Sequence, residues 1–165
     1  RPLATGTAPR ALPAALFPLL ARAVDLILPP TDTPGAAAAG VHWVLDDAAQ
    51  TDADLRATLS AGLARLDARA RARHGRGFLA LEPPAQTALL AEISDLPEGA
   101  AAAPEDRAFF ALLKARTLDA YYRSEIGQIG ELEWVGHEFH DEFPGACPHP
   151  DPLVHPRPRW PRRRR

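Results

Sequence analysis

The sequence predicts an all-α protein, with about five helices in a small bundle and a long irregular C-terminal arm. Between residues 12 and 127, apolar residues recur at the three- and four-residue steps of amphipathic helices. Prolines, glycines and capping residues divide these stretches at short intervals. After Gly127 the periodicity ends, and proline, histidine and arginine become frequent. We therefore expect a helical body at residues 1–127 and an irregular arm at residues 128–165, packed on a partner or partly disordered.

The first expected helix, residues 12–28, is followed by a corner with a high density of stiff residues. Pro18 lies near the first turn of this helix or kinks it. Two prolines end the helix, and the turn "TDTPG" completes the corner at residues 29–35. Because threonine and aspartate side chains can cap backbone amides and proline suits a first helical turn, a second helix is expected at residues 34–50.

Three further helices follow from capping residues and apolar spacing. An N-cap at Thr51 or Asp52 and leucines at four- and three-residue steps predict a third helix that ends near Gly75. The fourth helix opens at Pro83. The fifth covers residues 104–127, and its first turn is acidic, which suits the positive end of the helix dipole.

Composition limits the class of protein. With 165 residues, the chain is near the usual size of one domain. The net charge of -2 argues against attraction of the whole domain to nucleic acid, although the last nine residues carry six arginines. No apolar run approaches the roughly 20 residues of a membrane span. Because the sequence lacks a methionine start, we expect a processed or trimmed chain from which any targeting signal has been removed.

The histidine-rich stretch "HEFHDEF", residues 137–143, is a candidate metal site. His137 and His140 are three residues apart, whereas the helical zinc motif places its histidines four apart. Further ligands could come from Glu138, Asp141, Glu142, Cys147, His149 and His155. A small metal-binding protein that uses His137 and His140 is therefore one alternative, and a polar loop that contacts a partner is the other.

Catalytic motifs are not evident in the sequence. Ser60, Ser94 and Ser124 lack the flanking glycines of a nucleophile elbow. Asp46 and Asp47 are adjacent and so point to different sides of a helix, which is typical of a solvated surface. We expect no intrinsic enzyme activity, and no cofactor or metal bound by this chain.

The arginine-rich end, residues 157–165, has two interpretations. It could bind anionic lipid or nucleic acid through phosphate contacts, in which case binding would collapse with added salt. It could equally be a solvated, extended tail, because proline alternates with arginine there.

Adjacent aromatic residues near the end of the fifth helix predict contact with a second surface. Tyr121 and Tyr122 cannot both face one core, and tyrosine is favoured at protein interfaces. The corner also suits docking because its prolines already restrict the backbone, although a well-capped connection inside the bundle explains it almost as well. The expected partner interface comprises Pro30, Thr31, Asp32, Thr33, Pro34, Gly35, Tyr121, Tyr122, Glu125, Trp134, Phe139 and Phe143.

Four blocks of the sequence resemble the gluconate 2-dehydrogenase subunit 3 family. They are "LILPPTDTPGA" at residues 26–36, "GLARLDARARARHGRGFLAL" at 62–81, "PAQTALLAEI" at 84–93 and "FFALLKARTLDAYYRSEIG" at 109–127. The first and last blocks are the most specific. The ending matches the family only in part, at "ELEW" (131–134) and "FPGAC" (143–147), and the arginine-rich end has no counterpart.

The resemblance implies a non-catalytic, gamma-type small subunit of a periplasmic sugar or polyol dehydrogenase. Members of the family pair with a large FAD-containing subunit of the glucose-methanol-choline (GMC) type, often with a cytochrome c subunit as electron acceptor. Relatives carry a twin-arginine export signal, and the small subunit would help the flavoprotein to mature and travel with it. Substrates in the group include gluconate, glucose, fructose and glycosides. In an oxidising compartment, the single cysteine, Cys147, is a candidate for an intersubunit disulfide.

Overall fold

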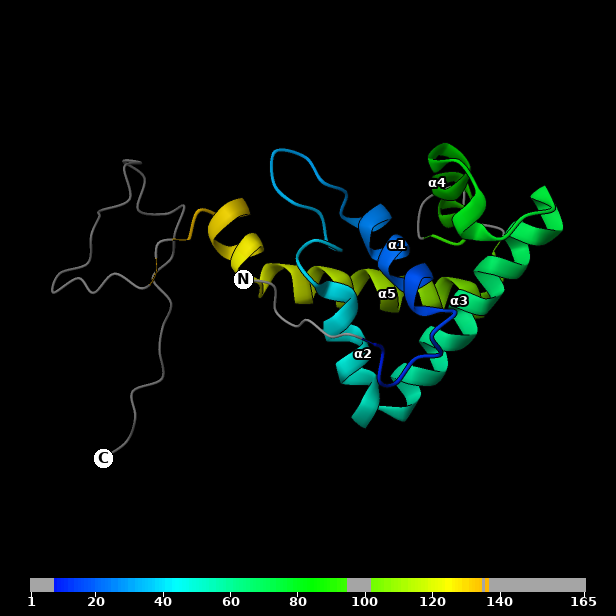
Figure 1. Ribbon diagram of the computed structural model, residues 1–165, viewed down its shortest axis with the longest axis horizontal. Coiled ribbons are helices and arrows are strands. Elements are labelled where there is room, and N and C mark those ends of the chain that lie inside the picture. The colour runs from blue at the N-terminus through cyan, green and yellow to red at the C-terminus, as the bar shows by residue number, and fades with distance from the viewer. Residues whose placement is uncertain (1–7, 95–101, 135, 137–165) are drawn as a thin grey trace, which may run out of the picture. The chain divides into compact units, whose positions relative to one another are not determined.

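The computed structural model describes residues 8–94, 102–134 and 136. The chain divides into two units, residues 1–134 and 135–165, and every described residue except 136 belongs to the first. The described part contains helices and no strand (Figure 1), which confirms the predicted all-α fold. None of the described helices is long and apolar enough to cross a membrane.

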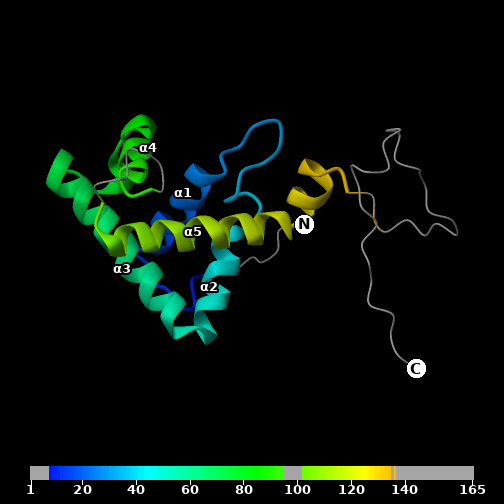
Figure 2. The same ribbon diagram turned by 180° about the vertical axis from the view of Figure 1, so that it is seen from behind.

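The described residues of the body form five α-helices and two short helices. The α-helices are α1 (Phe17–Ile27), α2 (Val41–Thr51), α3 (Ala53–His74), α4 (Pro83–Ala91) and α5 (Pro104–Tyr122). A 3₁₀-helix, η1 (Phe78–Ala80), connects α3 to α4, and a π-helix, η3 (Ile126–Glu131), follows α5. α5 contacts α1, α2 and α3, and Figure 2 shows it crossing in front of them. α4 packs on α3.

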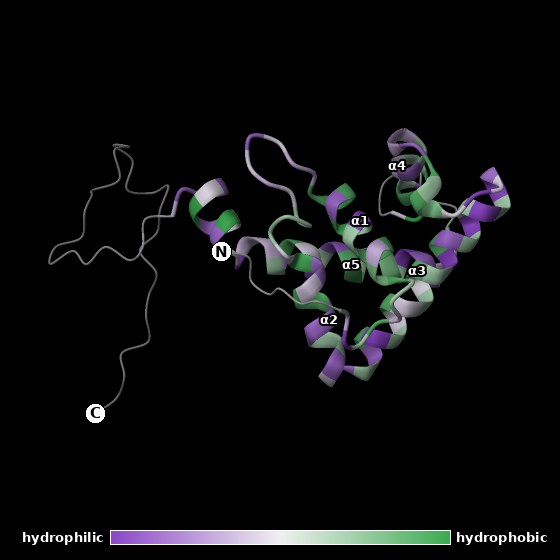
Figure 3. Cartoon of the chain, viewed as in Figure 1, coloured by the Kyte–Doolittle hydropathy of each residue, from purple (hydrophilic) through white to green (hydrophobic). Residues whose placement is uncertain are grey.

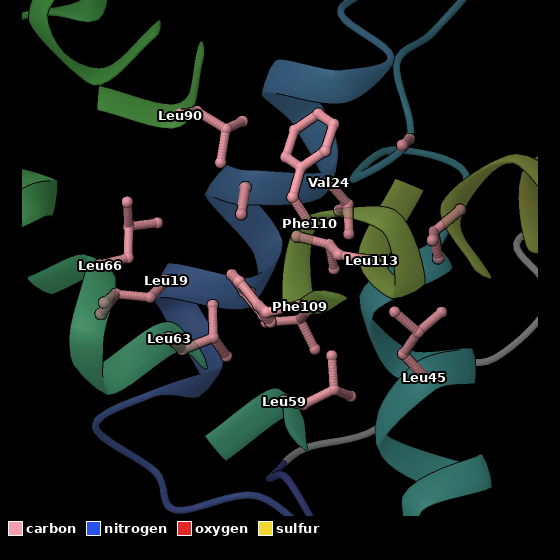
Figure 4. Packing of buried hydrophobic residues seen from close by; sticks show 14 of the residues in the cluster. Leu19, Val24, Leu45, Leu59, Leu63, Leu66, Leu90, Phe109, Phe110 and Leu113 are labelled. Carbon is pink, nitrogen blue, oxygen red and sulfur yellow. The ribbon is translucent and has the colours of Figure 1, made fainter. Parts of the chain in front are cut away.

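The core forms where leucines of α1 and α3 meet aromatic residues of α5 (Figure 4). Leu59, Leu63 and Phe109 are fully enclosed in it. At Gly62, α3 and α5 come so close that an added Cβ would lie 2.0 Å from a ring carbon of Phe109. A glycine in a helix interior lowers helix stability. At Gly62 this cost is offset because the missing side chain lets α3 and α5 pack closely.

Several predicted helix ends are confirmed. Asp52 is the N-cap of α3, and its carboxylate accepts a hydrogen bond from the Leu55 amide at 2.9 Å. Gly75 ends α3 in the left-handed conformation, with φ of 69°. Prolines lie in the first turn of α4 and of α5, as expected from the missing amide hydrogen of proline.

The first two helices begin later than predicted. α1 starts at Phe17 instead of residue 12, so Pro18 belongs to its first turn and does not kink it. α2 starts at Val41 instead of residue 34, because the intervening alanines turn back toward α1: the Ala36 amide donates to the Leu28 carbonyl at 3.0 Å. Gly40, with φ of 83°, then redirects the chain into α2.

Helical structure also differs from the prediction at the end of the body. α5 ends at Tyr122 instead of Gly127, and the chain then forms η3, where an irregular arm was expected from residue 128. Both glycines of η3, Gly127 and Gly130, weaken helix propensity, which is why a helix was not expected there.

Asp46 corrects a second expectation, since its side chain is buried and not on a solvated surface. Its carboxylate accepts hydrogen bonds from the backbone amides of Arg10, Ala11 and Leu12, at 2.6, 3.1 and 2.8 Å. These bonds fasten the segment before α1 to the side of α2. Asp47, by contrast, is exposed.

Asp46→Asn is expected to lower the free energy of unfolding by about 1–2 kcal/mol, because the NH₂ group of asparagine cannot accept the hydrogen bond that Oδ2 accepts from the Arg10 amide and the charge that strengthens the other two bonds is lost. Denaturant titration of the wild type, Asp46→Asn and the exposed control Asp47→Asn measures this. An equal effect of the two substitutions would contradict it.

A second buried carboxylate connects α5 to α3. Asp106 accepts hydrogen bonds from the guanidinium groups of Arg65, at 2.7 Å, and Arg69, at 2.5 Å. Its place in the first turn of α5 also suits the helix dipole, as predicted from sequence. Asp106 therefore fastens α5 to α3, the two helices that approach each other closely at Gly62.

His42, at the start of α2, lies in an aromatic cluster with Phe17 and Trp43. The Phe17 ring centroid is 5.3 Å from that of His42 and 4.5 Å from that of Trp43. Within the described part of the chain, the buried Nδ1 of His42 has no hydrogen-bond partner. Burial lowers the pKa of His42 below its ordinary value of 6.5, while the carboxylate of Asp25 acts in the opposite direction.

The body should therefore lose stability as the pH falls. Because the pKa of His42 is lower in the folded state than in the unfolded chain, the unfolded state binds more protons between the two values. This stabilisation is present above pH 6.5 and is lost as the pH falls through the folded pKa. Denaturant titrations at pH 7.5 and 5.5 should show a smaller loss for His42→Phe than for the wild type. His74→Gln, which changes an exposed residue, should keep the wild-type loss.

Candidate docking surface

The corner between α1 and α2 is a projecting loop with a fastened base (Figure 1). Pro29, Pro30, Thr31 and Asp32 are exposed at its tip. At the base, the Asp25 carboxylate accepts a hydrogen bond from the backbone amide of residue 37 at 3.2 Å. The prolines and this hydrogen bond together restrict the conformation of the corner.

Gly35 is buried in this base because only a residue without a side chain fits there. An added Cβ would lie 2.6 Å from Oδ1 of Asp25 and 2.8 Å from the nitrogen of Pro30. The segments around Asp25 and Pro30 can approach this closely because residue 35 is a glycine.

Tyr121 joins the corner to the end of α5. Its side chain is buried, and its hydroxyl donates a hydrogen bond to the Pro34 carbonyl at 2.9 Å. The same hydroxyl lies 3.5 Å from Oγ1 of Thr33. Tyr122 is half-buried, and the two rings meet edge to face with centroids 5.3 Å apart. Tyr121 therefore has little surface for a partner, and Tyr122 is the member of the pair with accessible area.

A tight joint connects α5 to η3. The Ser124 hydroxyl donates to the Tyr121 carbonyl at 2.6 Å and accepts from the Gly127 amide at 3.0 Å. Gly127 is buried against this turn, since an added Cβ would lie 2.2 Å from the Tyr121 carbonyl oxygen. The joint directs η3 back to the corner, where Thr33 donates a hydrogen bond to the carboxylate of Glu131.

Three apolar side chains are exposed at the end of this arrangement. They are Ile129, Leu132 and Trp134, with exposed fractions of 57%, 59% and 46%, and we call them the η3 face. Figure 3 shows hydrophobic residues on η3, outside the packed helices. Among the described residues, Leu79 is the other large hydrophobic side chain exposed to a similar degree. Apolar side chains grouped in this way are typical of a protein interaction site.

Comparison with models of protein families shows to which family the chain belongs. A model described as gluconate 2-dehydrogenase subunit 3 matches residues 14–140. The chain belongs to the gluconate 2-dehydrogenase subunit 3 family. Neither the curated proteins nor the solved structures compared with the chain gave a match. The family description indicates an accessory subunit of a dehydrogenase complex, which associates with other subunits of that complex.

The match to subunit 3 includes the corner, the end of α5 and the η3 face. These segments are far apart in the sequence, and the hydrogen bonds of Tyr121 and Thr33 bring them together. The described members of the predicted interface therefore fall into one region, with Glu125 exposed just before η3. Phe139, Phe143 and Cys147 lie outside the described residues, so those predictions stay untested.

Sequence reasoning missed two residues of the candidate docking surface of this subunit 3 protein. Ile129 and Leu132 continue a three-residue step that starts at Ile126, and that step could have been noticed. The glycines between them concealed it, because they suggested that the helix had ended.

The candidate metal ligands of the subunit 3 chain are not tested by the structure. His137 and His140, with the other candidates near them, lie outside the described residues. Within the described ranges, no three histidine, cysteine or acidic side chains are grouped as metal ligands.

Proposed function

We propose that this chain is the non-catalytic small subunit of a periplasmic FAD-dependent sugar dehydrogenase with a GMC-type flavoprotein as its large subunit. The substrate would be of the gluconate, glucose or glycoside class. The large subunit would hold the FAD, bind the sugar and carry out the oxidation, and a cytochrome c subunit would accept electrons in complexes that contain one.

The observation that carries this proposal is the hydrogen bond from Tyr121 to the Pro34 carbonyl. It fastens the corner to α5, so that two segments typical of the family form one preorganised surface next to the exposed η3 face. A rigid surface of this kind loses little conformational entropy when it binds. Such a surface suits a subunit whose role is to hold a partner.

The biological role would be to stabilise the flavoprotein, assist its maturation and accompany it during export. A subunit that binds the folded partner and not its unfolded chain stabilises that partner by mass action. Co-export through the twin-arginine route would then deliver the two folded subunits together.

Native mass spectrometry tests this function on material purified from the source organism through a tag on this chain, with absorbance recorded at flavin wavelengths. We expect a much heavier flavin-bearing partner at fixed stoichiometry. A colourless species of this chain's own mass, under conditions that preserve complexes, would overturn the proposal. Elemental analysis of that species would then test the metal-binding alternative.

Cys147 would form a disulfide with the large subunit in the oxidising periplasm. Non-reducing electrophoresis of the intact complex should show a covalent pair that Cys147→Ser abolishes. Unchanged mobility on that substitution would contradict the disulfide and leave the docking proposal unaffected.

A further inference from the structure

The η3 face has an apolar centre and an acidic border. Glu131 and Glu133 flank Leu132 in the sequence, and both are exposed. Asp32 is exposed at the tip of the corner, which the bond from Thr33 to Glu131 fastens to the same region. The border is therefore formed by carboxylates from two separate segments.

Within the described residues, the basic side chain nearest to this border along the chain is Arg123, which has an acidic partner of its own. Arg123 forms an ion pair with Asp119, one turn earlier in α5, at 2.9 Å. A pair of this kind satisfies its own charges, and the other charged side chains of the described residues 123–134 are the carboxylates Glu125, Glu131 and Glu133.

The backbone at Glu133 gives a second reason to connect this border with binding. Glu133 has φ of 51°, in the left-handed region that glycine adopts without steric cost. Around it, the Leu132 amide bonds to the Gly127 carbonyl at 3.0 Å and the Trp134 amide to the Gln128 carbonyl at 2.8 Å, which closes the helix end. The chain thus keeps a carboxylate at a strained position between two exposed apolar residues, and strain of this kind concentrates at functional sites.

A second copy of this chain is a poor occupant for the face. In a two-fold dimer the same patch meets itself, so the carboxylates of one copy would oppose those of the other. Like charges brought together at an interface disfavour binding. The partner must instead supply positive charge around an apolar surface.

We propose that the η3 face inserts into an apolar groove of the dehydrogenase's large subunit that is bordered by arginine or lysine side chains. This inference rests on the proposed function, and it adds the chemistry of the partner's surface. Ile129, Leu132 and Trp134 supply the desolvated centre, in which most of the binding energy of an interface usually lies. The carboxylates steer the approach and determine the orientation of the two subunits.

The test uses the complex recovered through a tag on this chain, with bound flavin as the readout of the large subunit. Leu132→Ser and Ile129→Ser should each lower recovery of the flavoprotein about tenfold or more, as expected for anchor residues. Leu79→Ser is the matched control, because Leu79 is similarly exposed on η1. It should recover the wild-type amount. Circular dichroism of each purified chain checks that the helices are retained.

The charge of the border is tested separately. Glu133→Lys should slow association and weaken binding, and added salt should slow wild-type association. Glu133→Gly should keep the fold, because glycine suits the backbone there, yet lose part of the salt dependence. Glu82→Lys, an exposed charge change before α4, is the control and should behave as the wild type.

The outcomes separate the two proposals. If the wild type recovers the flavoprotein and neither the apolar nor the charge substitutions change its binding, the groove inference is wrong and the accessory function stands. If the wild type recovers no flavoprotein, both are wrong. Equal losses from Leu132→Ser and Leu79→Ser would also overturn the inference, because the effect would not be specific to the face.

Discussion

Gly62→Ala is expected to lower the free energy of unfolding by about 3 kcal/mol. The added methyl group would lie 2.0–2.5 Å from three carbons of the Phe109 ring, at the closest contact between α3 and α5. Phe109 is fully buried, so its ring cannot move aside without displacing other core residues. Overpacking of a core costs about 1–3 kcal/mol and occasionally more. Denaturant titration followed by circular dichroism measures the change.

Helix propensity alone predicts the opposite sign for this substitution. Alanine is favoured over glycine in a helix interior by about 1 kcal/mol, so a gain in stability for Gly62→Ala would contradict the packing argument. Ala61→Gly, at the exposed neighbouring position, measures the propensity effect in the same helix. Gly62→Ala combined with Phe109→Leu should cost less than the sum of the single substitutions, because a smaller side chain relieves the overlap.

Gly127→Ala is expected to reduce recovery of the large subunit about tenfold or more while the α-helical body stays folded. The added Cβ would lie 2.2 Å from the Tyr121 carbonyl oxygen and 2.9 Å from the Cα of Tyr122. Because both are backbone atoms, no side-chain rotation can relieve the clash. The joint must open, so η3 moves away from the corner and the bond from Thr33 to Glu131 is lost. Loss of preorganisation at an interface weakens binding accordingly.

Gly130→Ala is the matched control within the same short helix. A Cβ at Gly130 meets no atom within 4 Å among the described residues, so the substitution should leave recovery unchanged. If Gly127→Ala and Gly130→Ala reduced recovery of the large subunit equally, any alanine in η3 would weaken binding. The contact of Gly127 with the Tyr121 carbonyl would then not be the cause.

Local rules were sufficient to predict the fold class and many helix ends. Asp52, Gly75 and the prolines of α4 and α5 act through neighbours in the sequence, so their effects could be predicted without tertiary structure. The expected docking region also rests on local signals, and it stays a prediction. Prolines at the corner and adjacent tyrosines are unusual enough locally to indicate a surface with a purpose beyond packing.

The remaining features depend on contacts between distant residues. Asp46 accepts hydrogen bonds from amides more than 30 residues away, so its neighbours in the sequence do not reveal that it is buried. The alanines before α2 have high helix propensity, yet they turn because the Leu28 carbonyl, Asp25 and Tyr121 fasten the segment around them. Tertiary bonds override propensity at such positions, and no local pattern reveals them.

Hydroxyl-radical footprinting of the purified complex, before and after its subunits are dissociated, tests most directly whether the corner and the η3 face bind the large subunit. Ile129, Leu132 and Trp134 should be oxidised much less in the complex than in the separated chain. Leu79 should be oxidised equally in both. Equal oxidation of the η3 face in the two states, together with protection elsewhere on the body, would contradict the docking surface described above.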